Sequence, residues 1–189
     1  TIQEENEENL IENIANVYLQ NIIFDNNTIL RAFSNCYYWL SNPLYKINIR
    51  NLNYYSDLQT NLSNYFRGNI IDFITDNNNK DYINIMFKNY LNTPINIYIN
   101  KISKNFLLYN GYIDLSILSK IYSTCVVVIN NFNDILFVVQ NGNILYDKYK
   151  KDDNNKYNSD EFLKKSLVIM FEYEFEEDSP NKIKSIYYT

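Results

Sequence analysis

Histidine is absent from this sequence of 189 residues. That absence removes the side chain that most often acts as a general base near neutral pH. It also removes the commonest ligand of transition metals, for which only two cysteines remain as alternatives. We therefore expect no metal centre, no cofactor and no catalytic step that relies on an imidazole.

Cysteine is nearly as rare, and the two cysteines are Cys36 and Cys125. A small secreted scaffold usually carries a denser set, so we expect an intracellular, cytoplasmic setting in which both thiols stay reduced. Cys36 falls on the apolar face of a predicted helix, and Cys125 begins a predicted buried strand. Both positions favour a packed thiol over a nucleophile.

The chain also lacks clustered cations and long apolar runs. Its net charge is −5 and its pI is about 4.8, whereas nucleic-acid binding needs grouped lysines and arginines. No run approaches the ~20 apolar residues of a membrane-spanning helix, and no charged-then-apolar leader opens the sequence. These features predict neither a nucleic-acid nor a membrane partner, and they leave the oligomeric state open.

The residues that are present suffice for one folded domain over residues 1–189. Hydrophobic residues make up 46% of the chain and aromatic residues 16%, which is enough for a substantial core. The chain is rich in asparagine, isoleucine, tyrosine and lysine, as proteins from A+T-biased genomes are. We therefore expect a parasite or a virus as the source, and the sequence leaves open whether this domain is part of a larger protein.

Apolar residues recur at helical spacing in several segments. Residues 1–20 are predicted to hold an N-terminal helix behind an acidic first turn. From Ile29 to Leu40 the spacing predicts a core helix, which Pro43 would end. Further helices are expected at residues 51–67, 81–91 and 113–121, and residues 96–102 are expected to form either a short strand or a turn of helix.

Strand patterns gather in the second half of the chain. The β-branched run from Cys125 to Ile129 is typical of a strand buried on both faces. Asn141-Gly142 between two alternating segments predicts a hairpin with a type I′ turn. Strands are also expected at residues 167–175 and 182–188, with a polar loop at 147–160. The chain is thus predicted to be an α+β protein, a sandwich of helices around a small mixed or antiparallel sheet.

One segment carries a recognisable motif. Residues Asp25 to Ser34 read Asp-Asn-Asn-Thr-Ile-Leu-Arg-Ala-Phe-Ser. This resembles the active-site segment of the ovarian-tumour (OTU) family of deubiquitinating cysteine proteases, which reads Asp-Gly-Asn-Cys-Leu-Phe-Arg-Ala-Phe/Leu-Ser. Eight positions are kept or conservatively changed, while the glycine becomes Asn26 and the nucleophilic cysteine becomes Thr28. The resemblance implies a papain-like fold.

Two later blocks extend the resemblance over residues 25–188. Residues 98–129, with Gly111 and Asp114-Leu115, resemble the family's Trp-Gly-Gly, Glu-Leu and Ala-Leu-Ser block and the buried strand after it. Residues 167–188 resemble the family's last apolar strand and its terminal His-Tyr. By this resemblance the catalytic histidine position falls on Tyr187 or a neighbour.

These substitutions remove the family's chemistry. A threonine hydroxyl is far less acidic than a thiol, and threonine nucleophiles use their own chain-terminal amine, whereas Thr28 is internal. A tyrosine phenol has a pKa of about 10 and is a poor base at neutral pH. Losing triad members costs several orders of magnitude in rate. We expect no catalytic residues, with Asp25, Thr28 and Tyr187 as degenerate positions.

The resemblance therefore predicts a catalytically inactive, OTU-like pseudoenzyme that binds or scaffolds a protein, ubiquitin or a ubiquitin-like protein being the family's partner. Two alternatives remain open: an active hydrolase with an unorthodox site around Thr28 and Asp25, and an unrelated α+β interaction domain. From its position alone, Thr28 is expected to be an N-cap whose hydroxyl accepts a first-turn amide. Asp25, which lies beside the oxyanion pocket in the family, is expected here to fix the turn.

Overall fold

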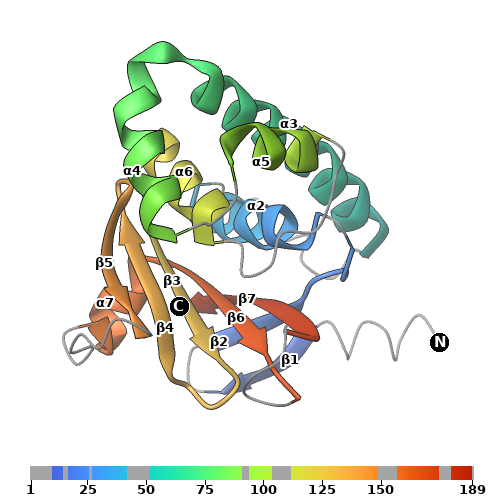
Figure 1. The fold of residues 1–189 in the computed structure, drawn as a ribbon. Helices are drawn as coiled ribbons and strands as arrows, with labels where there is room; N and C mark the ends of the chain where they lie inside the picture. Colours follow the sequence, from blue (N-terminus) through green and yellow to red (C-terminus); the bar gives the residue numbers. More distant parts are fainter. Residues whose placement is uncertain are drawn as a thin grey trace.

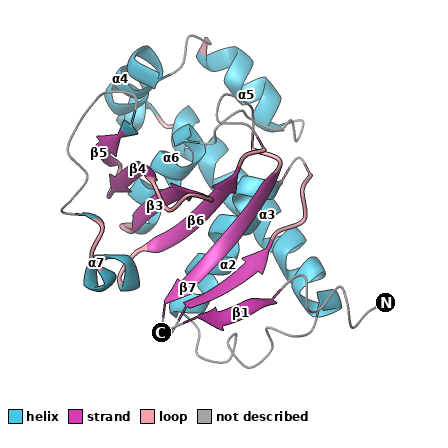
Figure 2. Cartoon of the chain, turned by 90° about the horizontal axis from the view of Figure 1, so that it is seen from below, coloured by secondary structure: helices cyan, strands magenta, loops and turns pink. Residues whose placement is uncertain are grey.

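A mixed sheet of seven strands lies at the centre of the protein (Figures 1 and 2). The computed structural model describes residues 10–14, 17–25, 27–41, 52–90, 94–103, 112–148, 157–174 and 180–188. The strand order is β1-β2-β7-β6-β3-β4-β5. β3 and β6 pair in parallel and every other neighbouring pair is antiparallel. The strands are β1 (Leu10–Ile14), β2 (Val17–Asn21), β3 (Cys125–Asn130), β4 (Ile135–Gln140), β5 (Asn143–Asp147), β6 (Leu167–Glu172) and β7 (Lys182–Tyr188).

Helices cover one face of this sheet in two layers (Figure 1). α2 and α6 contact the strands directly, and α3 packs on both of these helices. The helices are α2 (Thr28–Ser41), α3 (Leu52–Thr75), the 3-10 turn η2 (Asn77–Asn79), α4 (Lys80–Tyr90), α5 (Ile95–Ser103), α6 (Tyr112–Tyr122) and α7 (Asp160–Lys164). The short α7 contacts β6 and β7 instead and covers the opposite face.

The apolar core has two parts because strand side chains alternate between the two faces of a sheet. In β3, Val126 and Val128 face the helices, whereas Val127 and Ile129 face α7. All but Ile129 of these four are fully buried. The predicted strand buried on both faces is therefore confirmed, and the fold is of the α+β class.

Most of the predicted elements are confirmed. The helix after Asp25 runs over Thr28–Ser41, and α4 and α6 match the expected segments within one or two residues. Asn141 and Gly142 both have positive φ, 48° and 79°, as a type I′ turn requires. The last strand has the predicted bounds, and the segment at 96–102 is helical, within α5.

The predicted N-terminal helix is wrong where the structure describes it. Residues 10–14 and 17–21 form the strands β1 and β2, while residues 1–9 and 15–16 lie outside the described residues. β2 pairs with β7 from Val17↔Tyr188 to Asn21↔Lys184. The pairing with β7, a strand more than 160 residues away, overrides the local helical spacing. No short window of sequence contains that partner strand.

Three other boundaries differ from expectation. α3 continues beyond residue 67 to Thr75, because Ile70 and Ile74 carry its buried face onward. The predicted strand at 167–175 is β6, which ends at Glu172. The expected polar loop at 147–160 overlaps ordered elements at both ends: Asp147 is the last residue of β5, and Asp160 is the first residue of α7, which Ser159 caps. Asp147 and Tyr157 are also buried. Pro43, Gly111 and residues 149–156 lie outside the described residues.

Candidate functional site at the start of helix α2

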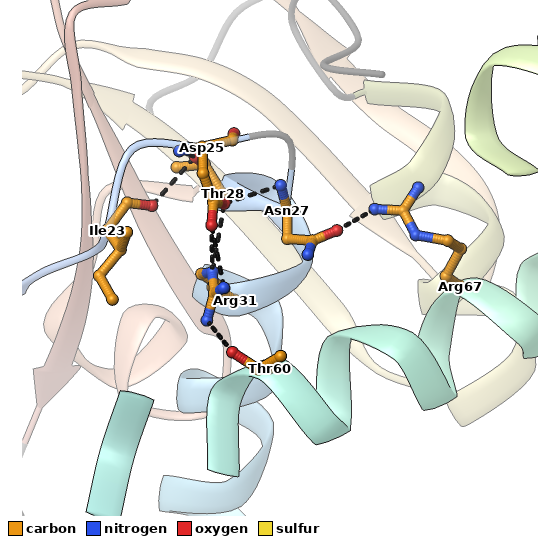
Figure 3. A network of polar contacts seen from close by, with 7 residues as sticks. All are labelled: Ile23, Asp25, Asn27, Thr28, Arg31, Thr60 and Arg67. Carbon is orange, nitrogen blue, oxygen red and sulfur yellow. Dashed lines mark hydrogen bonds and ion pairs between the residues drawn. The ribbon is translucent and has the colours of Figure 1, made fainter. Parts of the chain in front are cut away.

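Thr28 is the first residue of α2 and is fully buried. Its hydroxyl accepts a hydrogen bond from the backbone N of Asp25 at 2.7 Å. The same hydroxyl donates toward the carbonyl oxygens of Asp25, at 2.7 Å, and Ile23, at 3.1 Å (Figure 3). The expected N-cap bond to a first-turn amide is thus wrong, because the hydroxyl bonds back to the preceding loop. Asn27 instead takes the cap position, since its carbonyl accepts the N–H of Arg31 at 2.8 Å.

Asp25 fixes the turn before α2, as expected. Its Oδ1 accepts the backbone N–H of Asn27 at 2.8 Å. Both carboxylate oxygens also bind the guanidinium of Arg31, with Nε 3.1–3.2 Å and Nη2 2.9 Å away. Arg31 has only 6% of its side chain exposed and Asp25 has 37%. A carboxylate held in this bidentate pair is directed at the arginine and not at the hydroxyl of Thr28.

The same network ties the start of α2 to the outer helices (Figure 3). Arg31 donates through Nη1 to the hydroxyl of Thr60 in α3 at 3.0 Å. Arg67, also in α3, donates through Nη2 to Oδ1 of Asn27. Its Nη1 donates to the carbonyl of Ile102 in α5 at 2.7 Å. The motif segment is therefore held in place by two arginines, one of which the sequence reasoning did not identify.

A second buried cluster lies beyond Arg67. The hydroxyl of Tyr98 in α5 donates to Oδ1 of Asp114 in α6. Burial raises the pKa of Asp114 to about 6, against the opposing effects of the Tyr98 hydrogen bond and the Arg67 charge. Burial also lowers the pKa of Arg67 and raises that of Tyr98. The one sequence signal for this cluster is an aspartate inside the apolar run after Tyr112.

The residues of β7 that meet the start of α2 come before Tyr187 in the strand. The loop before α2 meets the beginning of β7, where Ile22 donates to the carbonyl of Ile183 at 3.0 Å. One helical turn after Thr28, the carbonyl of Ala32 accepts the hydroxyl of Ser185 at 3.2 Å. The backbone of Tyr187 lies further along β7, opposite Tyr18 of β2.

The assignment of the histidine position to Tyr187 or a neighbour stays a prediction, and the backbone places Tyr187 beyond the residues of β7 that meet the start of α2. Strand residues advance by roughly 3.3 Å each, so Tyr187 lies about 13 Å along β7 from Ile183. Because helix α2 runs across β7 from its beginning, the strand residues at the level of Thr28 are those at the start of β7. Correct bounds for a strand do not determine its register against a helix, so the sequence alone does not say which residue of β7 meets the helix start.

Both cysteines are free and packed, as predicted. Cys36 lies two turns after Thr28 with its Sγ 3.3 Å from the carbonyl oxygen of Val168. Burial raises the pKa of the Cys36 thiol to about 12. Burial also raises the pKa of the half-buried Cys125. Since the thiolate is the reactive form, neither cysteine is set up as a nucleophile.

The described residues also bear on metal binding and on membrane insertion. Over the residues that the structure describes, no group of three or more His, Cys, Asp or Glu side chains could hold a metal ion. Within the same residues, none of the helices combines the length and the apolar character needed to cross a bilayer.

Comparison with known proteins gives one relative. The chain is 32% identical over 191 residues to the uncharacterized protein R327 of Acanthamoeba polyphaga mimivirus. The match takes in 99% of this chain but only 12% of the viral protein. A virus is one of the sources expected from the composition. No family model matches the chain, and no solved structure matches it.

Proposed function

We propose that this chain is a non-catalytic, OTU-like domain that binds or scaffolds another protein. The observation that carries the proposal is the hydroxyl of Thr28. It is fully buried, and among the described residues each of its hydrogen-bond partners is a backbone group of Ile23 or Asp25. A hydroxyl placed in this way closes a loop, and none of these partners within the described part of the chain is a base that could activate it.

The charges around Thr28 support the same conclusion. An active hydroxyl nucleophile needs an adjacent general base that takes its proton. Asp25 is the nearest carboxylate in the network, but Arg31 binds both of its oxygens. Tyr187, the position that the resemblance assigns to the base, lies toward the other end of β7. Thr28 and Asp25 therefore act as structural residues.

The partner is proposed to be ubiquitin or a ubiquitin-like protein, as the resemblance implies. Exposed apolar side chains at the same end of the sheet support a protein-binding role. Ile23 and Phe24, just before the motif, are 48% and 46% exposed, and Phe132 in the β3–β4 turn is 63% exposed. That turn is held beside the end of β6 by two hydrogen bonds between Asn131 and the backbone of Tyr173.

Titration of the ¹⁵N-labelled protein with mono-ubiquitin and with linked chains tests the partner. We expect chemical-shift changes confined to residues 23–25 and 131–133. Phe24→Asp should abolish them, whereas Ile85→Asp, which replaces an even more exposed apolar residue of α4, should leave them unchanged. Signals that stay flat at high ubiquitin concentration would reject ubiquitin and leave scaffolding of another protein.

A ubiquitin probe with a cysteine-reactive group tests the absence of the family's chemistry. The two packed cysteines should leave the protein unlabelled. Labelling at Cys36 or Cys125 would contradict the site assignment and favour an active hydrolase.

A further inference from the structure

A polar cluster joins three helices within the layer that covers the sheet. Asp114 of α6 is 5% exposed, Tyr98 of α5 is 1% exposed and Arg67 of α3 is 7% exposed. The Tyr98 hydroxyl donates to the carboxylate of Asp114, and the guanidinium of Arg67 acts on that carboxylate through its charge. A buried carboxylate is thus supported by one hydroxyl and one cation.

Arg67 is shared among several groups. Its two terminal nitrogens bind the carbonyl of Ile102 and the side chain of Asn27. Its Nε is buried and has no hydrogen-bond partner among the described residues. Asn27 caps α2, so the guanidinium connects Asp114 to the loop that carries Ile23 and Phe24.

We infer that Asp114, Tyr98 and Arg67 form a proton-sensitive clasp, which holds α3, α5 and α6 more tightly around the start of α2 when Asp114 binds a proton. An ionised carboxylate deprived of water needs several hydrogen bonds or a dedicated ion pair. Among the described residues, Asp114 has a single tyrosine donor and a guanidinium that is engaged elsewhere. Its neutral form therefore suits the site better.

Other charged groups around α6 do not replace the missing partners. α2 contributes Arg31, which is bound to Asp25. α4 contributes Tyr82, whose hydroxyl bonds to Gly142 and whose ring lies under Lys120 near the far end of α6. β3 and β4 contribute apolar side chains to this face, and β5 ends in Asp147 beside β4. The first turn of α6 favours a negative charge through the helix dipole, but burial outweighs this effect.

The sign of the pH dependence follows from the raised pKa of Asp114. Burial raises it from an ordinary 3.8 to about 6. The folded protein then binds this proton more tightly than the unfolded chain does, so the clasp's contribution is complete below pH 3.8 and is lost as the pH rises through about 6. A shift of about two pKa units changes the folding equilibrium constant by about a hundredfold.

Urea unfolding of the wild type and of Asp114→Asn between pH 4 and 8 tests the clasp. Asparagine mimics the neutral carboxyl, so the variant should fold about a hundredfold more favourably than the wild type above pH 6.5 and only a few-fold more favourably near pH 4. Asp81→Asn is the matched control, because Asp81 is an exposed aspartate in the first turn of α4. The ratio of its folding equilibrium constant to that of the wild type should not rise in this way between pH 4 and pH 6.5. A ratio for Asp114→Asn that stays constant with pH would overturn the clasp.

Two further measurements test the clasp, and the first stands even if the variant folds poorly because it uses only the wild type. The carboxyl carbon of Asp114 in the wild type, followed by NMR, should titrate near pH 6, and a midpoint near 4 would overturn the clasp. Hydrogen exchange at pH 7.5 should show the amides of Asp25, Asn27 and Thr28 better protected in Asp114→Asn than in the wild type, relative to the β4–β5 hairpin. If these amides were equally protected in the two proteins, the charge of Asp114 would have no effect on the start of α2, and this part of the clasp would be rejected.

Discussion

Two buried polar networks meet at Asn27, and they differ in how well their charges are compensated. In the first, around Asp25, Thr28 and Arg31, the carboxylate and the hydroxyl have directed partners. In the second, Asp114 is more deeply buried than Asp25, and among the described residues the Nε of Arg67 lacks a hydrogen bond. In the segment that resembles an active site, the polar groups thus have hydrogen-bond partners. The groups that we infer to respond to pH lie in the cluster of Asp114, Tyr98 and Arg67, to which the motif does not point.

Replacing Arg31 should give the largest loss of stability. Arg31→Ala removes the bidentate pair with Asp25 and the bond to Thr60. Deleting one partner of a buried pair costs about 3–5 kcal/mol, and the partial exposure of Asp25 reduces this to about 2–4 kcal/mol here. Urea denaturation would measure the loss. Asp25→Asn is the control, because it keeps an acceptor for Asn27 and should cost less. A loss below about 1 kcal/mol for Arg31→Ala would remove the contrast between the two networks.

Tyr98→Phe should destabilise the second network in a pH-dependent way. The variant leaves a carboxylate oxygen of Asp114 without its donor, which costs about 1–3 kcal/mol for a buried group. The loss should be larger at pH 7.5 than at pH 4, because the ionised carboxylate needs the donor more. Thermal unfolding at both pH values, with the exposed Tyr65→Phe as control, would measure it. A loss that is the same at both pH values would argue against a role for the charge of Asp114.

Thr28→Val should cost about 1–2 kcal/mol, because the backbone N–H of Asp25 loses its acceptor. Thr28→Ser keeps the hydroxyl and should cost less than the valine variant does. Urea unfolding of the two variants gives the comparison. Equal stability of Thr28→Val and the wild type would mean that the hydroxyl is not needed to close the loop.

The smallest expected effect concerns the thiols, which report on packing without a mutation. Cys125, being half-buried, should react with a thiol reagent faster than the buried Cys36 in the native protein. Both should react at similar rates in denaturant. Faster native labelling of Cys36 would show that the face between α2 and β6 opens.

The sequence predicts local features of the fold well and long-range ones poorly. A few neighbouring residues suffice to predict three features: the buried strand β3 from its β-branched run, the turn at Asn141-Gly142, and the helix α2 from its apolar spacing. The strands β1 and β2 could not be predicted in this way, because β2 is a strand through its pairing with the distant β7. The α3 helix was predicted too short because its buried face continues past Gly68.

The candidate site shows the same division. The position of Thr28 at a helix start could be predicted, but the partner of its hydroxyl could not, since a threonine there can bond forward or backward along the chain. The bounds of β7 could be predicted as well, but they do not determine which of its residues lies level with Thr28. Arg67, Tyr98 and Asp114 come from three helices with no fixed spacing, so their association appears only in the folded protein.

Hydrolysis of a fluorogenic ubiquitin conjugate tests the central claim most directly, since it asks whether Thr28 is a structural residue or a nucleophile. Wild type, Thr28→Ser and Thr28→Val should be assayed at a temperature where all three are folded by circular dichroism. If Thr28 is a structural residue, the hydrolysis rate with each of the three proteins should equal the rate in buffer alone. A wild-type rate above that of buffer, kept by Thr28→Ser and lost in Thr28→Val, would contradict it.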